Sequence, residues 1–393
     1  MSFIRLASSA ISGGIFGALI AVLALLVLQP GEYGLFSIVY LTFAFGISLQ
    51  YSVINEAWAR GQLSGESNGS WPAFCAALIS LSAVVSIAIF IVALFVPILQ
   101  PYSWLLSLAV LFALYRNGAR YHALALGELK RVVISDSTGI IAFAVAVAAL
   151  SYSGAPALLV VFVSWLASCV GGSVFFAVPR LRRECGPTHW IKAHGKDIRP
   201  LLFDSLLMDA GAIGTPFLLA GVMGSVRFGV YRAVSNVALP VRLLIDPIRP
   251  IIGRSSHSLL FSVRSSGLIG SAILVMTAAC YFALTWLVPH IGVNLGTLTS
   301  LVPFAAPAAL FVAGSATGTL YYIVCRTGAS QRLILIGRVF QTVVVVAMPI
   351  AGYFFVGLRG AIWGFAVSAI VSGGVWAWFA FRATRSANEG PLL

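Results

Sequence analysis

Arginines stand inside long apolar segments of this chain, where a charged side chain is costly. Arg116 and Arg120 are four residues apart in the segment 104–126, and Arg242 and Arg249 lie in a later segment. A guanidinium at a helix centre costs about 2.5–3.5 kcal/mol on membrane-insertion scales, so by default it faces an aqueous cavity or a charged partner. Planar guanidinium groups bind phosphate oxygens in pairs, so these positions suit a diphosphate ligand.

The second of these segments carries a polar stripe. Arg232, Asn236, Arg242, Asp246 and Arg249 follow one another at helical spacing within and beside the segment 229–252, and a helix that faced lipid could not carry them. We interpret the arginines as cations that bind substrate in a cavity. The five candidates for this role are Arg116, Arg120, Arg232, Arg242 and Arg249.

An alternative interpretation gives the same arginines only structural partners. The two arginines on either side of Asp246 would then neutralise that carboxylate. Arg116 and Arg120 would pair with Asp136, or extend along the helix to the inner membrane surface. The sequence leaves both interpretations open.

Carboxylates inside the segments are candidates for ion coupling. Asp204 and Asp209 lie in one apolar segment, and Asp246 is a third candidate. Gly211 and Pro216 permit a local break in the helix there, and broken helices are where transporters hold coupling ions. A carboxylate in such a cavity could carry a proton or ligate sodium, so Na⁺ or H⁺ is the coupling ion we expect. The alternative is an ion pair from Asp209 to an arginine.

Glu56 and Arg60 are also four residues apart, where an apolar segment ends beside Trp58. They could form a gate that opens and closes during transport. The alternative is an exposed ion pair worth less than about 1 kcal/mol.

The composition places these residues in a membrane protein. Hydrophobic residues make up 60% of the 393 and charged residues only 9%, against roughly 25% charged in a soluble domain. A membrane helix needs about 20 apolar residues. We predict a retained first helix rather than a signal peptide, and twelve spans in all: 8–28, 35–54, 73–96, 104–126, 132–150, 157–178, 201–223, 229–252, 268–288, 300–323, 333–356 and 361–381.

The distribution of positive charge predicts the orientation. The net charge of +13 would suggest nucleic acid in a soluble protein. Here, however, 16 of the 24 Lys and Arg residues fall in alternate loops and the termini, whereas the opposite loops hold only Arg227 and Arg359. The positive-inside rule therefore predicts cytoplasmic termini and no nucleic-acid partner. The basic segment 179–200 is interpreted as a cytoplasmic linker between an N-terminal lobe, 1–178, and a C-terminal lobe, 201–393.

A sequence repeat divides the chain at the same place. Residues 32–36 (EYGLF) and 227–231 (RFGVY) share an aromatic, a glycine, an aliphatic and an aromatic residue, and we interpret both as bends between apolar segments. Gly154 and Gly357 precede the sixth and twelfth segments. We therefore predict an all-α integral membrane protein of two six-helix bundles, related by a pseudo-two-fold axis along the membrane normal.

Short motifs resemble a known family. The runs Ser8–Gly14 (SSAISGG), Leu28–Ser37 (LQPGEYGLFS) and Phe228–Ala233 (FGVYRA) look like the polysaccharide transporter branch of the multidrug/oligosaccharidyl-lipid/polysaccharide exporter superfamily, which includes the Wzx-type O-antigen flippases. The resemblance implies two lobes around a central cavity and movement of undecaprenyl-diphosphate-linked oligosaccharides across the cytoplasmic membrane. Membrane lipids, a polysaccharide polymerase and glycosyltransferases are the partners that it implies.

Two other function classes stay open. An ion-coupled multidrug or small-molecule exporter of the same superfamily would need an acidic cavity for cationic drugs, whereas arginines outnumber carboxylates here. A membrane glycosyl- or acyltransferase would need a catalytic loop, and no large external loop is predicted. The sequence shows no nucleotide-binding Gly-Lys motif and no Cys or His spacing typical of a metal site. We therefore expect no enzyme, no catalytic residue and no cofactor besides the coupling ion.

Overall fold

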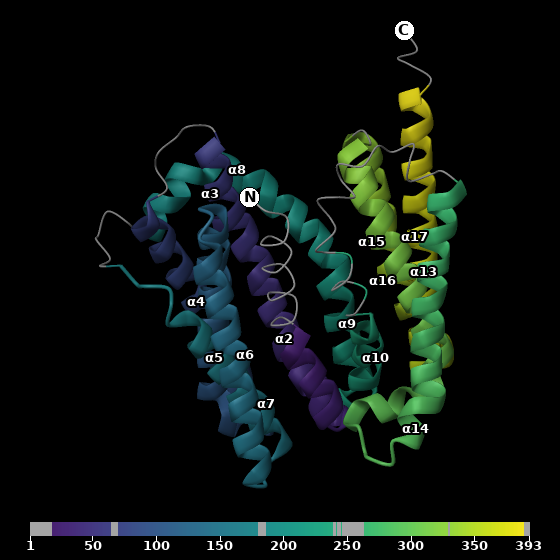
Figure 1. Cartoon of the computed structure of the whole chain (residues 1–393), viewed down its shortest axis with the longest axis horizontal. Helices are drawn as coiled ribbons and strands as arrows, with labels where there is room; N and C mark the ends of the chain where they lie inside the picture. Colours follow the sequence, from purple (N-terminus) through teal and green to yellow (C-terminus); the bar gives the residue numbers. More distant parts are fainter. Residues whose placement is uncertain are drawn as a thin grey trace. The chain divides into compact units, whose positions relative to one another are not determined.

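A computed structural model describes residues 18–63, 70–179, 186–238, 241, 245, 263–328 and 331–388, and every regular element within these ranges is helical (Figure 1). The chain divides into two compact units. The N-unit comprises residues up to Ala24 and Leu35–Asp209, and the C-unit comprises Leu25–Gly34 and the residues from Ala210 onward. Each unit is described by itself.

The N-unit is a bundle of long helices. Helix α4 packs on α5, α5 on α7, and α6 on α7, while α8 contacts α3, α4 and the π-helical turn η1. A shorter apolar helix, Ala18–Val27, precedes α2. The elements are α2 (Pro30–Gln50, of which Pro30–Gly34 belongs to the C-unit), η1 (Tyr51–Asn55), α3 (Glu56–Leu63), α4 (Trp71–Leu94), η2 (Gln100–Tyr102), α5 (Ser103–Ala125), α6 (Leu129–Tyr152), α7 (Ala157–Ser173) and α8 (Pro187–Asp209).

In the C-unit, α17 packs along both α15 and α16, and α13 packs on α15. Small residues allow the closest of these approaches, because a side chain on Gly314 of α15 would meet the backbone of Ala369 on α17. The elements are η4 (Ala210–Gly214), α9 (Thr215–Met223), α10 (Ser225–Val237), α13 (Val263–Phe282), η5 (Ala283–Leu287), α14 (Val288–His290), η6 (Gly296–Phe304), α15 (Ala305–Gly328), α16 (Gln331–Val356) and α17 (Leu358–Asn388).

Within the described residues, eight helices are long and apolar enough to cross a membrane, and two shorter apolar helices accompany them. Helix α5 is not among the eight, although at 23 residues it is long enough, because polar residues including Arg116 and Arg120 interrupt it. Each of the twelve predicted spans falls on a helix in its described part. The layout of twelve spans in two six-helix bundles stays a prediction.

Large apolar side chains cover the outward surfaces of these helices. Val84 on α4 is 65% exposed, Ile141 on α6 is 62% exposed and Leu274 on α13 is 68% exposed. Exposed apolar surface on this scale is unfavourable in water but matches lipid, and helices satisfy their backbone groups internally as a bilayer requires. The protein is therefore a multi-pass membrane protein.

The repeated motif lies at equivalent positions of two helices. Gly34 is the fifth residue of α2, and Gly229 is the fifth residue of α10. A side chain on Gly34 would collide with the carbonyl oxygen of Ser225, the first residue of α10. A side chain on Gly229 would collide with that of Pro30, the first residue of α2. Such a reciprocal contact is what a local two-fold relation produces. The two copies of the motif lie in the first turns of α2 and α10, which cross here, so the interpretation of the motif as a bend is wrong.

The second sequence match is also reflected in the backbone. Gly154 follows α6 with φ of +69°, and Gly357 follows α16 with φ of +66°. Glycine adopts this left-handed conformation without strain, which ends one helix and redirects the chain into the next. Helices α7 and α17 begin within three residues of these glycines.

Much of the predicted linker is helical. Helix α8 begins at Pro187 and continues through the residues that we expected to form a loop up to 200. Trp190, His194, Ile198 and Leu201 are buried on one face at helical spacing. The indole of Trp190 donates a hydrogen bond of 2.9 Å to the carbonyl oxygen of Val53. The expectation of a loop from 187 to 200 is wrong because these charged residues belong to an amphipathic helix.

Candidate functional site

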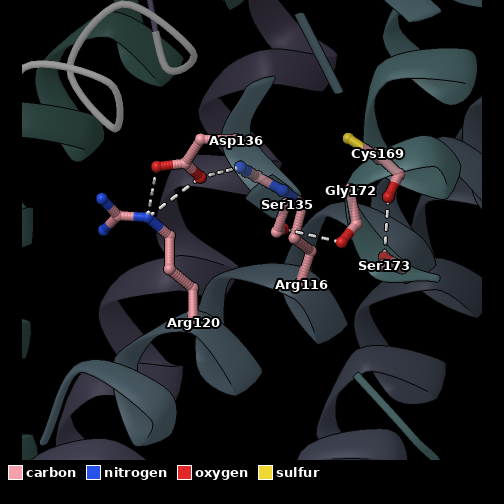
Figure 2. Close-up of polar contacts among 7 residues, drawn as sticks. All are labelled: Arg116, Arg120, Ser135, Asp136, Cys169, Gly172 and Ser173. Atoms are coloured by element: carbon pink, nitrogen blue, oxygen red, sulfur yellow. Dashed lines mark hydrogen bonds and ion pairs between the residues drawn. The ribbon is translucent and has the colours of Figure 1, made fainter. Parts of the chain in front are cut away.

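The arginines of α5 meet a carboxylate of α6 in the N-unit. Arg116 forms an ion pair through Nη2 with Oδ1 of Asp136. The Nε of Arg120 lies 3.2 Å from both carboxylate oxygens of the same residue. Figure 2 shows the two guanidinium groups converging on Asp136. The pairing that the sequence left as an alternative is therefore the observed geometry.

Chain geometry explains why these three residues meet. Helices α5 and α6 are joined by a tight turn at Gly127, whose φ is +79°. Asp136 lies nine residues after this glycine (136 − 127), and Arg120 and Arg116 lie seven and eleven residues before it (127 − 120 and 127 − 116). In an antiparallel helical hairpin Asp136 therefore lies at the level between the two arginines, which share one helix face.

Helix α7 provides a close wall behind Arg116. The hydroxyl of Ser135 donates a hydrogen bond of 2.7 Å to the carbonyl oxygen of Gly172 (Figure 2). A side chain on Gly172 would collide with Nε of Arg116. The glycine is therefore what allows the guanidinium to lie against α7.

The three side chains differ in exposure. Asp136 is fully buried, the side chain of Arg116 is 6% exposed, and that of Arg120 is 19% exposed. Two arginines and one aspartate sum to a charge of +1. Both arginines and Asn117 line a cavity of about 140 Å³ in the N-unit, which also has aromatic walls. Because Arg120 is the more exposed, it is the better placed of the two to contact a ligand.

Buried amides continue this polar site, and sequence reasoning missed them. Asn117 donates a hydrogen bond of 3.1 Å to the side-chain oxygen of Gln50, and the Gln50 amide donates one of 2.8 Å to the carbonyl oxygen of Leu114. Gln50 is fully buried. An amide next to Arg116 in an apolar segment was a signal that could have been used, because buried amides are retained where they have partners.

Asp209, a predicted ion-coupling residue, is buried at the end of α8. Its Oδ2 atom has no hydrogen-bond partner within the described part of the chain. Where glycine and proline predicted a local break, the helix instead continues from α8 into the π-helical turn η4. Such turns are frequent at functional sites. The side chain of Asp204 lies outside the described residues, and the coupling role of both stays a prediction.

In the C-unit, Arg232 and Asn236 lie on α10 and line a second cavity. The Asn236 amide donates a hydrogen bond to the Tyr33 hydroxyl, near the start of α2. The other predicted residues of this stripe lie outside the described residues: Arg242, Asp246 and Arg249. Their roles stay predictions.

Glu56 and Arg60 both lie on α3. Glu56 is half-buried and Arg60 is exposed. The ion pairs found among the described residues join arginines to Asp136 and Glu128, so the expected ion pair between Glu56 and Arg60 is not one of them. The gate role stays a prediction.

No protein-family model matches the chain, and no curated protein matches it. Solved structures do match. An inward-facing multidrug resistance MATE family transporter of the MOP superfamily has a TM-score of 0.58 at 16% identity, covering 98% of this chain and 96% of that one. An outward-facing one has a TM-score of 0.56 at 15% identity, covering 99% and 96%. A MOP superfamily transporter from Pyrococcus furiosus, whose pocket is described as reversed in polarity, has a TM-score of 0.57 at 14% identity, covering 97% and 95%. The chain therefore has the fold of MATE transporters of the MOP superfamily.

Proposed function

We propose that this protein is a transporter that moves a polyprenyl-diphosphate-linked oligosaccharide across the cytoplasmic membrane by alternating access. The observation that carries the proposal is the cluster of Arg116, Arg120 and Asp136, whose charges sum to +1 beside a cavity inside the N-unit. Two arginines line this cavity, and guanidinium groups bind phosphate oxygens in pairs, so a diphosphate headgroup is the ligand that matches it.

The fold supports a transport role. Structures of the same fold are described in outward-facing and inward-facing conformations. An alternating pair of such states carries a bound solute across a membrane without a catalytic step. In this proposal both termini are cytoplasmic, Asp209 couples the cycle to Na⁺ or H⁺, and glycosyltransferases and a polymerase act before and after transport.

The polarity of the N-unit cavity favours an anionic substrate over a cationic drug. Arg120 would contact the diphosphate directly, because it is the more exposed arginine of the cluster. Arg116 would hold Asp136 and so position its neighbour. For the Pyrococcus furiosus transporter, the reverse polarity of the binding pocket is described as suggesting a different function. We extend this reasoning to the present chain.

The test is a flipping assay with purified protein in proteoliposomes that contain a defined lipid-linked oligosaccharide. Arg120→Ala removes charge-assisted hydrogen bonds worth about 1.5–3 kcal/mol, so translocation should fall roughly 10- to 150-fold. Arg120→Lys keeps the charge but loses the planar fork, so it should recover only part of the rate. Arg359→Ala removes an exposed arginine of α17 and serves as the matched control, with an unchanged rate.

Two results would overturn the proposal. One is translocation by Arg120→Ala at the rate of the unmodified protein. The other is transport of cationic compounds by proteoliposomes that leave the lipid-linked oligosaccharide in place, which would favour the multidrug exporter instead.

A further inference from the structure

The C-unit contains a partly open cavity of about 250 Å³ with both polar and apolar walls. Its walls come from η4, α9 and α10 in one part of the chain and from α15, α16 and α17 in another. A single buried water needs only about 10–15 Å³ of such space, so this cavity is large enough for a small polar ligand.

Three buried hydroxyl groups line this cavity without a hydrogen-bond partner in the described part of the chain. They belong to Thr215 on α9, Tyr231 on α10 and Ser372 on α17. Thr215 and Tyr231 are each 1% exposed, and Ser372 is 3% exposed. A buried hydroxyl without a partner is unfavourable, and native proteins hold few of them. Three such groups around one cavity, from three helices, indicate a ligand that bridges them.

The other polar groups of the walls define the chemistry of this ligand. Arg232 is the one charged residue among the described residues of the lining, and Asn236 and Gln341 contribute amides. A bound cation such as Na⁺ would be repelled by the arginine, and the described residues of the lining include no carboxylate to offset that repulsion. Hydroxyl groups both donate and accept hydrogen bonds, so the matching ligand carries several groups that do the same.

Aromatic rings complete the cavity. The rings of Phe311 and Phe365 are stacked with centroids 4.3 Å apart, and the ring of Tyr231 lies 5.3 Å from that of Phe365. All three residues line the cavity. An apolar wall facing a set of hydroxyl and amide groups suits a pyranose ring, which has an apolar face and a polar edge.

We infer that this cavity of the C-unit binds a glycosyl residue of the transported glycan, through the hydroxyl groups of Thr215, Tyr231 and Ser372. The assignment of the sugar to the transported glycan rests on the proposed function. The recognition of a pyranose ring rests on the cavity itself. The inference therefore gives the protein a sugar site that is distinct from the arginine cluster of the N-unit.

The experiment measures binding of four free sugars to the purified full-length protein: methyl glucoside, galactose, rhamnose and N-acetylglucosamine. Saturation-transfer NMR gives affinities, and thermal unfolding gives the stability of the unliganded protein. Thr215→Val, Tyr231→Phe and Ser372→Ala each remove one hydroxyl at almost constant shape. We expect at least one sugar to bind, and each substitution to weaken its affinity about two- to tenfold.

A second readout separates binding from a structural role. Removing a hydroxyl that has no partner should leave the unfolding midpoint of the unliganded protein unchanged or raised. Thr297→Val is the matched control, because Thr297 is also buried in the C-unit but donates a hydrogen bond of 2.8 Å to the carbonyl oxygen of Leu28. This control should lower the midpoint and leave sugar affinity unchanged.

Three outcomes contradict the inference. They are the failure of all four sugars to bind, equal affinity in all variants, and midpoints that fall as in Thr297→Val, which would indicate that water fills the cavity. Flipping assays separate this result from the proposed function. Hydroxyl-dependent sugar binding without flipping would refute the flippase but keep the site. Failure of the unmodified protein to bind any of the four sugars, together with unimpaired flipping by the triple variant, would refute the site alone.

Discussion

Asp136→Asn should destabilise the protein more than any other single change in the arginine cluster. The substitution keeps the shape of the side chain but removes a fully buried negative charge that two arginines share. The cluster then changes from +1 to +2, with the side chain of Arg116 only 6% exposed. Breaking a buried ion pair by removing one partner costs about 3–5 kcal/mol, and we expect a loss of stability of this size.

A double substitution separates the charge from the guanidinium itself. Arg116→Met alone brings the net charge of the cluster to zero, whereas Arg116→Met combined with Asp136→Asn restores a net charge of +1. The double variant should therefore be more stable than Asp136→Asn, although it carries one more change, with a coupling energy of about 0.5–3 kcal/mol. If Arg120 contacts the substrate and the other two residues position it, the double variant should flip the substrate more slowly than the unmodified protein but faster than Arg120→Ala.

Stability is measured by denaturant unfolding of the detergent-solubilised protein, and flipping by the proteoliposome assay at equal protein content. The reasoning is refuted if Asp136→Asn unfolds at the same denaturant concentration as the unmodified protein. It is equally refuted if the double variant loses the sum of what the single variants lose, since independent sites would add in this way.

Two further predictions concern the repeated motif and the polar stripe of the segment 229–252. Gly34→Ala and Gly229→Ala should each destabilise the protein by about 1–3 kcal/mol, because the added carbon meets a backbone carbonyl. Gly31→Ala is the control, because its added carbon would lie 3.4 Å from the nearest side chain, an ordinary contact, and the stability should change by less than about 0.5 kcal/mol. Equal unfolding of all three variants would contradict the close crossing of α2 and α10. Arg242→Ala should abolish glycan export and Arg242→Lys restore part of it, whereas rescue by combining Arg242→Ala with Asp246→Ala would rule out substrate binding by Arg242.

The sequence by itself determined the membrane class, the positions of most helices and the matching glycines of the repeated motif. Apolar runs of about 20 residues form helices in lipid whatever their neighbours, because the backbone must satisfy its own hydrogen bonds there. The glycines of the repeated motif were also visible, and the structure places Gly34 and Gly229 at equivalent positions. The spacing of Trp190, His194 and Ile198 indicated that α8 starts before residue 200, but we predicted a loop there because of the charged residues around them.

Only the tertiary structure decided how the polar side chains pair. The sequence allowed Arg116 to pair with Asp136 or to bind a ligand, and the hairpin of α5 and α6 brought the two residues together. The hydroxyl groups of Thr215, Tyr231 and Ser372 carry no local signal, since serine, threonine and tyrosine are common in membrane helices. They become a candidate site because helices from distant parts of the chain place them around one cavity without partners in the part of the chain that the structure describes. Burial and hydrogen-bond partners are properties of packing between helices, and the periodicity of one helix does not contain them.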